Sequence, residues 1–241
     1  MLTSSPCEWY DGWHAIEETR GMRFGEPVDR YYDGLIYARL IDPMLRGCRK
    51  MIAGMIPEGS RVADFGCGTG ALCRDLAQKG CHVTGYDFSS AMIRAAHRLS
   101  RNTTGHIAFR QADVLVLDPA TFGELDCIVL SLVLHEQDMP IRMNTLQLAA
   151  NSAHHVIIAD FNYPIPGRLG RWITYSTEFL AGPKHFKYFR MYNLHEGMQG
   201  LLDDFHLRIL DDHTACNGIV RIVRTCSPVT DFENSPEEST R

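Results

Sequence analysis

The residues best suited to chemistry lie in segment 62–70, where Gly66, Gly68 and Gly70 follow a short apolar run. Glycine permits positive φ and close approach of a ligand, and the amides that begin the next helix can donate hydrogen bonds. Asp64 opens this loop and places an anion beside it. Because an anion attracts a cation and repels a pyrophosphate, we expect the loop to bind a ligand that carries positive charge.

The glycine spacing alone leaves two classes of ligand open. Gly66, Gly68 and Ala71 also satisfy a relaxed dinucleotide fingerprint, so a nicotinamide-dependent oxidoreductase is one interpretation. The acidic Asp64 and a third glycine after only one intervening residue favour S-adenosylmethionine instead.

Two further carboxylates end the next two expected strands. Asp87 follows the second strand, where it can accept hydrogen bonds from both ribose hydroxyls. Asp113, preceded by Ala112, ends the third strand and could accept from an adenine amino group, with Phe88 and Met92 as apolar neighbours of the ring. The alternative for Asp113 is a helix cap or a turn residue.

His135 and Glu136 come just after the fourth expected strand, at the edge where ligands gather in open α/β sheets. An imidazole or carboxylate there could take a proton from a hydroxyl or a carbon acid. The alternative is that His135 only shapes a pocket. Asp160, at the end of the fifth strand, is a weaker candidate for the same role.

Short β-rich runs alternate with helical patterns from residue 61 onward, which predicts successive βα units and a parallel sheet. The expected strands are 61–65, 82–87, 107–111, 126–132 and 156–161, followed by a hairpin of 207–211 and 218–224 with a polar turn at 212–217. The expected helices are 43–55, 71–78, 91–100 and 141–150. Ser89 or Ser90 caps the third of these, and Asp138 caps the fourth.

Four successive segments resemble the motifs of class I S-adenosylmethionine-dependent methyltransferases of the small-molecule branch. The order of the four segments and the distances between them along the chain also resemble those of that family. These segments are 64–70, 85–89, 111–113 and 131–136. The resemblance covers roughly residues 30–225. It implies a Rossmann-like α/β fold: a seven-stranded sheet of order 3-2-1-4-5-7-6, with strand 7 antiparallel and helices on both faces.

The same resemblance implies the roles of individual residues. Asp64 and the three glycines would line the methionine side of S-adenosyl-L-methionine, Asp87 the ribose, and Ala112 with Asp113 the adenine. Ser131 belongs to the fourth motif, and Tyr31 or Tyr32 would close over the ligand. A further segment resembles an aromatic lid over the acceptor, through Glu178, His185, Phe186, Tyr188 and Phe189.

The composition of the chain limits the kinds of molecule that it is expected to bind. The net charge of −5 offers no positive field for a nucleic acid, and the apolar runs are too short to span a membrane, so we expect neither a nucleic acid nor a membrane as partner. The eight cysteines lack zinc spacing and are expected as reduced thiols, and no metal is expected. With no secretory signal at the N-terminus, we expect a cytoplasmic monomer or homodimer acting on a small-molecule acceptor.

The expected organisation is an N-terminal helical cap (1–58), a methyltransferase domain (59–226) with a helical, aromatic insertion at about 163–204, and a flexible tail (227–241). Besides the oxidoreductase, a protein that binds S-adenosylmethionine without catalysis and a macromolecular methyltransferase are the alternatives.

Overall fold

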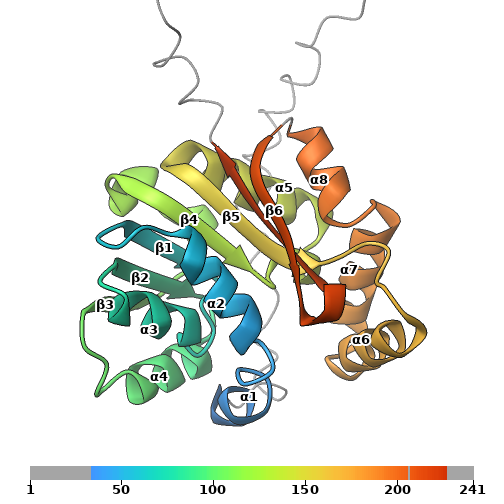
Figure 1. Ribbon diagram of the computed structural model, residues 1–241, viewed down its shortest axis with the longest axis horizontal. Coiled ribbons are helices and arrows are strands. Elements are labelled where there is room, and N and C mark those ends of the chain that lie inside the picture. Colours follow the sequence, from blue (N-terminus) through green and yellow to red (C-terminus); the bar gives the residue numbers. More distant parts are fainter. Residues whose placement is uncertain (1–33, 206, 227–241) are drawn as a thin grey trace, which may run out of the picture.

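The computed structural model describes residues 34–205 and 207–226. Most of the expected N-terminal cap, Tyr31 and Tyr32, and the expected tail lie outside these residues. Within them, seven strands form one sheet of order β3-β2-β1-β4-β5-β7-β6 (Figure 1). The pairs among β1 to β5 are parallel, and β7 runs antiparallel to both β5 and β6. The predicted fold class is confirmed.

The strands are β1 (Arg61–Phe65), β2 (His82–Asp87), β3 (His106–Gln111), β4 (Leu125–Ser131), β5 (Ala153–Phe161), β6 (Arg208–Ala215) and β7 (Val220–Cys226). The helices are α1 (Gly34–Leu40), α2 (Arg46–Met55), α3 (Ala71–Gln78), α4 (Ser90–Leu99), α5 (Met139–Ser152), α6 (Arg168–Leu180), α7 (Pro183–Leu194) and α8 (Met198–Asp204). A 3₁₀ helix, Leu134–Glu136, follows β4.

Alternate residues of the central strands supply two apolar layers, one on each face of the sheet. On one face, Val62, Val129 and Ile157 pack with side chains of α2, α3 and α4. On the other face, Phe65 and Ile158 pack with side chains of α5, α7 and α8. Because strand side chains alternate between faces, strands that are apolar on both faces are buried on both.

Two helices begin where the sequence predicts a cap. Ser89 Oγ accepts a hydrogen bond from Met92 N at 3.3 Å, and Asp138 Oδ1 accepts from Ile141 N at 3.1 Å. Side-chain oxygens at this position satisfy amides that have no partner within the helix. Ser89, rather than Ser90, is therefore the cap of α4.

The predicted hairpin turn at 212–217 is wrong, because β6 continues through Ala215. The polarity of Asp212 suggests a turn, but its two carboxylate oxygens accept hydrogen bonds from the Arg221 guanidinium on β7 at 2.7 and 3.0 Å. Arg224 likewise pairs with Asp211. Charged residues are common on an edge strand, where cross-strand pairs form and solvent reaches one side. The helix predicted at 43–55 likewise begins only at Arg46.

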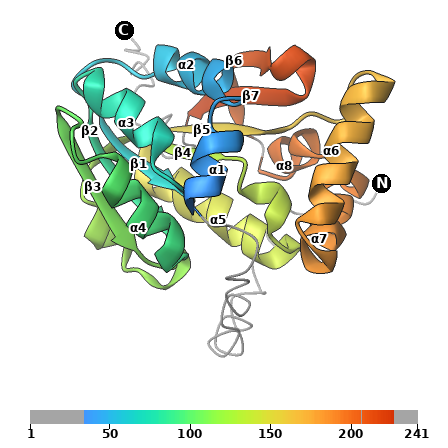
Figure 2. The same ribbon diagram turned by 90° about the horizontal axis from the view of Figure 1, so that it is seen from below.

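Helices α6, α7 and α8 lie between β5 and β6 in the chain and gather on the side of the sheet away from β3 (Figures 1 and 2). They occupy the segment expected as a helical, aromatic insertion. None of the helices within the described ranges is both long and apolar enough to cross a bilayer.

Candidate functional site

The glycine loop joins β1 to α3, and two of its glycines are required by their surroundings. Gly66 and Gly70 have φ of +78° and +71°. A methyl group on Gly66 would lie 2.8 Å from Val133, and one on Gly70 would lie 2.5 Å from the Phe109 ring. By contrast, a methyl group on Gly68 would meet no atom within 4 Å, so this side of the loop is open to a ligand.

Asp87 holds the glycine loop in place. Its Oδ2 accepts from Gly68 N at 2.8 Å and its Oδ1 accepts from Ser89 N at 2.8 Å. Burial raises the pKa of this carboxyl, while the two amide hydrogen bonds oppose the shift. Each carboxylate oxygen can accept more than one hydrogen bond, so both retain capacity toward a ligand hydroxyl.

Asp64 lies beneath the loop rather than on its surface. The residue is 2% exposed, and its Oδ2 accepts from the Cys73 thiol at 3.2 Å. Burial raises the pKa of Asp64 to about 7; the Cys73 hydrogen bond opposes this shift and the nearby Asp87 adds to it. The negative charge expected beside the loop is therefore only partly present at neutral pH.

A third carboxylate at the loop lies outside the residues that the sequence predicts for the site. Asp42, just after α1, accepts from the Thr69 hydroxyl at 2.6 Å, and both residues are buried. Arg74 donates to the Thr69 carbonyl at 2.7 Å, which fixes the loop from the side of α3. Nothing in the sequence near Asp42 signals a partner 27 positions away.

The ends of β2 and β3 lie side by side. Ala112 N donates to Asp87 O at 3.0 Å, and Gln111 Nε2 donates to Phe88 O at 3.3 Å. The Phe88 side chain is half exposed beside the loop. Asp113 Oδ1 accepts from Leu115 N at 3.0 Å, so it caps the short helix Val114–Val116, the alternative weighed for this residue.

His135 lies in the 3₁₀ helix after β4, and Asp160 of β5 anchors it. Its Nδ1 is 2.7 Å from Asp160 Oδ1, and the Asp160 carboxylate also accepts from the amides of Leu134, His135 and Phe161 at 2.7 to 3.2 Å. Both side chains are buried. The imidazole is thus fixed in position by a carboxylate whose hydrogen-bonding capacity is largely used.

The other ring nitrogen of His135 faces two glutamates. Nε2 lies 3.7 Å from Glu178 of α6 and 3.8 Å from Glu136, which in turn lies 3.9 Å from Nδ1 of His185 on α7. We call these five residues the His135 cluster: His135, Glu136, Asp160, Glu178 and His185. They come from four segments of the chain, and three of them carry carboxylates.

Charge within the His135 cluster sets its protonation. Burial disfavours the imidazolium, but Asp160, followed by Glu178 and Glu136, outweighs burial and raises the pKa of His135 to about 9. Burial raises the pKa of Glu136 to about 7, against the effect of the His135 charge. At neutral pH His135 therefore carries its proton, whereas Glu136 can exchange one.

Aromatic rings enclose the cluster on the side of the insertion. The His135 ring centroid lies 4.6 Å from that of Phe161 and 6.3 Å from that of Phe189. Phe189 also meets Tyr175 at 5.0 Å. Of the expected lid residues, Glu178 and Phe189 are buried against the cluster, whereas His185, Phe186 and Tyr188 are half buried.

Arg142 of α5 fixes the turn that carries His135, and it too was missed. The residue is 1% exposed; its guanidinium donates to Leu134 O at 2.8 Å and Gln137 O at 2.7 Å, and it lies 5.0 Å from the Tyr192 ring centroid. A buried cation needs such partners. A single arginine in a helical pattern gives no sign of this in the sequence.

The structure brings the predicted residues together at the carboxyl ends of the parallel strands. Asp64 lies near the end of β1, which the glycine loop follows; Asp87 ends β2 and precedes Phe88, and Ala112 and Asp113 follow β3. Ser131 ends β4, His135 and Glu136 follow it, and Val133 packs against Gly66. Among the described residues, no group of three or more His, Cys, Asp or Glu side chains is arranged to hold a metal ion.

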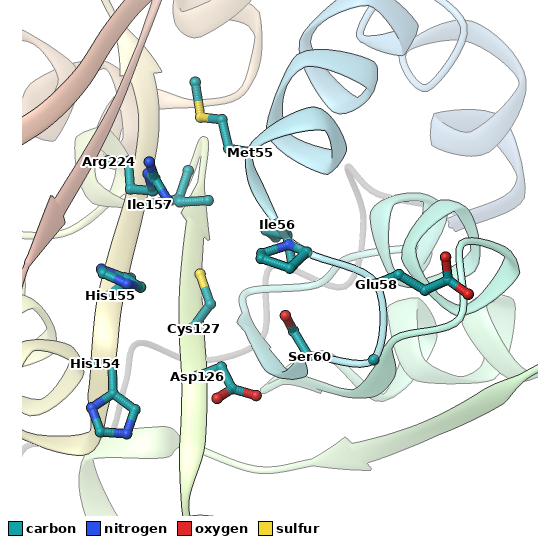
Figure 3. A pocket seen from close by; sticks show the side chains of 12 residues that line it. Met55, Ile56, Glu58, Ser60, Asp126, Cys127, His154, His155, Ile157 and Arg224 are labelled. Carbon is teal, nitrogen blue, oxygen red and sulfur yellow. The ribbon is translucent and has the colours of Figure 1, made fainter.

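A hollow of about 440 Å³ lies at the opposite edge of the sheet (Figure 3). The loop 55–60 and the amino ends of β4 and β5 line it, with Cys127 and His155 side by side on adjacent strands. The burial-raised pKa of Cys127, about 12, leaves this thiol protonated. The hollow takes no part in the site at the carboxyl edge.

Comparison with known proteins matches residues 62–155 to a family model described as a methyltransferase domain. This chain carries a methyltransferase domain. The matched segment contains the glycine loop, Asp87, His135 and Glu136. Asp160, Glu178 and His185 follow this segment in the chain.

Curated relatives match this chain over part of its length. The chain is 31% identical over 108 residues to a ubiquinone biosynthesis O-methyltransferase of Alkalilimnicola ehrlichii, covering 44% of this chain and 43% of the relative. It is 35% identical over 85 residues to a magnesium-protoporphyrin O-methyltransferase of Rhodobacter capsulatus, covering 34% of this chain and 37% of the relative. The matches thus span less than half of these two relatives.

Among solved structures, the chain resembles a magnesium protoporphyrin IX methyltransferase from Synechocystis with bound SAM. The TM-score is 0.54 at 17% identity, and the match covers 91% of each chain. This likeness extends the common fold beyond the methyltransferase domain to the insertion and the terminal hairpin.

Proposed function

We propose that this chain transfers a methyl group from S-adenosyl-L-methionine to a small-molecule acceptor by in-line displacement. The observation that carries the proposal is the carboxyl edge of the sheet. There, a glycine loop with an open face lies beside a buried group of carboxylates and a fixed imidazole. The O-methyltransferases named above, one of ubiquinone biosynthesis and one of magnesium-protoporphyrin, support a small-molecule acceptor.

The residues at the glycine loop fit the cofactor. Asp87 keeps free acceptor capacity for ribose hydroxyls, Gly68 presents open space, and Phe88 offers a half-exposed ring for the adenine. We assign Gly66, Gly70, Ala112, Asp113 and Ser131 to the same binding surface, and Asp64 to the support of the loop from beneath. The expected role of Tyr32 rests on the sequence resemblance alone. When bound, the cofactor supplies an electrophilic methyl group on a sulfonium.

The His135 cluster contributes position and a proton acceptor. Holding the acceptor atom close and aligned accounts for much of the catalysis in a displacement of this kind. We assign proton acceptance to Glu136, because its carboxylate form is present at neutral pH, and positioning to His135, which already carries its proton. The proton is removed from a hydroxyl or carbon acid; an acceptor without one would need only alignment.

Thermal unfolding with and without S-adenosylmethionine, S-adenosylhomocysteine and NAD tests the cofactor. At about 100 times the dissociation constant, a ligand specific for the folded chain adds about 2.7 kcal/mol and raises the midpoint by about 5–11 °C. A shift with NAD alone would overturn the proposal in favour of an oxidoreductase.

Transfer of labelled methyl from the cofactor to small molecules of a cell extract tests the reaction. Label that stays on the cofactor despite tight binding would instead support a regulatory protein that binds without turnover. The expectations of a cytoplasmic monomer or homodimer that binds no nucleic acid rest on the sequence, and we retain them as part of the proposal.

A further inference from the structure

Helix α6 turns apolar side chains to solvent. Leu169, Trp172, Phe179 and Leu180 are 66% to 70% exposed, and Ile173 is 41% exposed. Their spacing of three, four or seven residues places them on one arc of the helix, opposite the buried Thr174 and Glu178. Soluble proteins rarely expose such contiguous apolar patches unless the patch meets a partner.

Within the segment 163–194, which contains α6 and α7, every exposed charge is positive. Between residues 163 and 194 the exposed charged residues are Arg168, Arg171, Lys184, Lys187 and Arg190, whereas the one acidic residue, Glu178, is buried beneath them. The whole chain carries a net charge of −5. This segment therefore presents a local surplus of positive charge on an acidic protein, together with exposed tryptophan and leucine.

The arc lies at the margin of the molecule. In both views α6 stands at the outer edge, across the molecule from β3 (Figures 1 and 2). Its inner side supplies Glu178 to the His135 cluster, 3.7 Å from His135 Nε2. One helix therefore joins the exposed apolar arc to the candidate acceptor side of the site.

We propose that the outer face of α6, with the basic residues of α7, docks onto the surface of an anionic lipid bilayer. A helix with one apolar arc and basic flanks lies in the plane of the interface, with tryptophan at the level of the headgroups. The 13 residues of α6 span about 20 Å, short of the ~30 Å hydrocarbon core, so the helix lies on the membrane and does not cross it.

Charge decides between a bilayer and a second copy of the chain. A two-fold interface on α6 would bring the same basic residues of both copies close together, and like charges across an interface oppose association. An anionic bilayer instead offers charge of the opposite sign to the basic residues of α6 and α7. The proposal departs from the expectation of no membrane partner, and it stands whether or not the carboxyl edge transfers methyl groups.

Flotation of the full chain with lipid vesicles tests the apolar arc. We expect the chain to float with vesicles containing phosphatidylglycerol and to remain behind with pure phosphatidylcholine, and we expect 0.5 M NaCl to release it. The double variant Trp172→Ser, Leu180→Ser should lower partitioning at least tenfold. The matched control is Val116→Ser, a 78% exposed apolar residue outside α6 and α7, which should float as the wild type does.

A second pair of variants tests the charges. Lys184→Gln with Lys187→Gln should lower partitioning about tenfold, because each cation near the surface contributes to binding. Arg98→Gln with Arg101→Gln, at two exposed arginines outside the insertion, should change partitioning little. Unchanged unfolding midpoints would show that all four variants fold.

Three results would overturn the proposal. One is no flotation with either vesicle, and another is equal flotation of the α6 variants and their controls. The third is absence of flotation together with a dimer in solution that the variant Trp172→Ser dissociates. That result would assign the apolar arc to an interface with a second copy of the chain.

Discussion

The glycine loop and the His135 cluster share one edge of the sheet but are built differently. The loop is one continuous segment whose shape comes from backbone conformation, and Asp87 fastens it through backbone amides. The His135 cluster has no such continuity: its side chains come from the turn after β4, from β5, from α6 and from α7, and each lies within 4 Å of at least one other member.

Because of this difference, the glycine loop and the His135 cluster should respond to different substitutions. A loop held by its backbone tolerates changes that keep its glycines, whereas the cluster depends on individual buried side chains that have few substitutes. The variants below separate the two halves, since each should impair one and spare the other.

Asp160→Ala should have the largest effect. It removes the acceptor of three backbone amides and leaves a buried imidazole without its anchor, so we expect the free energy of unfolding to fall by about 3–5 kcal/mol. Urea denaturation followed by circular dichroism measures this. Asp118→Ala, an exposed cap that accepts from Ala120 N, is the control and should cost about 1 kcal/mol. Equal losses would show that Asp160 is no special anchor.

Glu136→Gln should lower the rate constant for methyl transfer about 100-fold with an acceptor that loses a proton. The pKa of Glu136 is raised from its ordinary value to about 7, so its carboxylate form grows as the pH rises through 7. The wild-type rate should rise over that range, and the variant should lose this limb. Initial rates from pH 5.5 to 9 provide the measurement. A variant that keeps the limb would assign it to another group.

Asp87→Ala should weaken binding of S-adenosylhomocysteine by about 1–3 kcal/mol, through lost hydrogen bonds to a charged group and a less ordered loop. Isothermal titration calorimetry measures the affinity. His135→Ala is the companion variant, and its affinity should stay close to that of the wild type because His135 lies outside the glycine loop. If the two variants lose affinity equally, the separation into halves fails.

Ser89→Ala should have the smallest effect, a loss of about 1 kcal/mol in the free energy of unfolding, because the Met92 amide loses its cap. Ser90→Ala is the neighbouring control. Its hydroxyl accepts only from Arg94 on the surface, so we expect a few tenths of a kcal/mol. Thermal denaturation of both variants compares them, and a larger loss at Ser90 would reverse the assignment of the cap.

The sequence predicts the glycine loop well because its signals are local. Strand β1, the loop and α3 lie within 18 residues, and each glycine reports a backbone requirement at its own position. The strand order was predicted from motifs in series that resemble those of a known family, and it is confirmed.

The His135 cluster was predicted only in part. His135, Glu136 and Glu178 were named as candidates, but their distances depend on how α6 packs against the turn after β4. The sequence did not predict Arg142 or Asp42 as residues of the site. Arg142 binds backbone carbonyls, and the partner of Asp42 is the side chain of a residue distant in the sequence. The extension of β6 was missed because the aspartates that suggested a turn pair with arginines of β7.

The antiparallel strand β7 also has a consequence for synthesis of the chain. Strand β5 lies between β4 and β7, yet β7 begins 59 residues after β5 ends and is made last of all the strands. Until Val220–Cys226 leaves the ribosome, the apolar run Val156–Ala159 has an open edge on which other nascent chains can pair. A ribosome-bound chain that stops short of residue 220 should therefore need a chaperone more than the finished chain does.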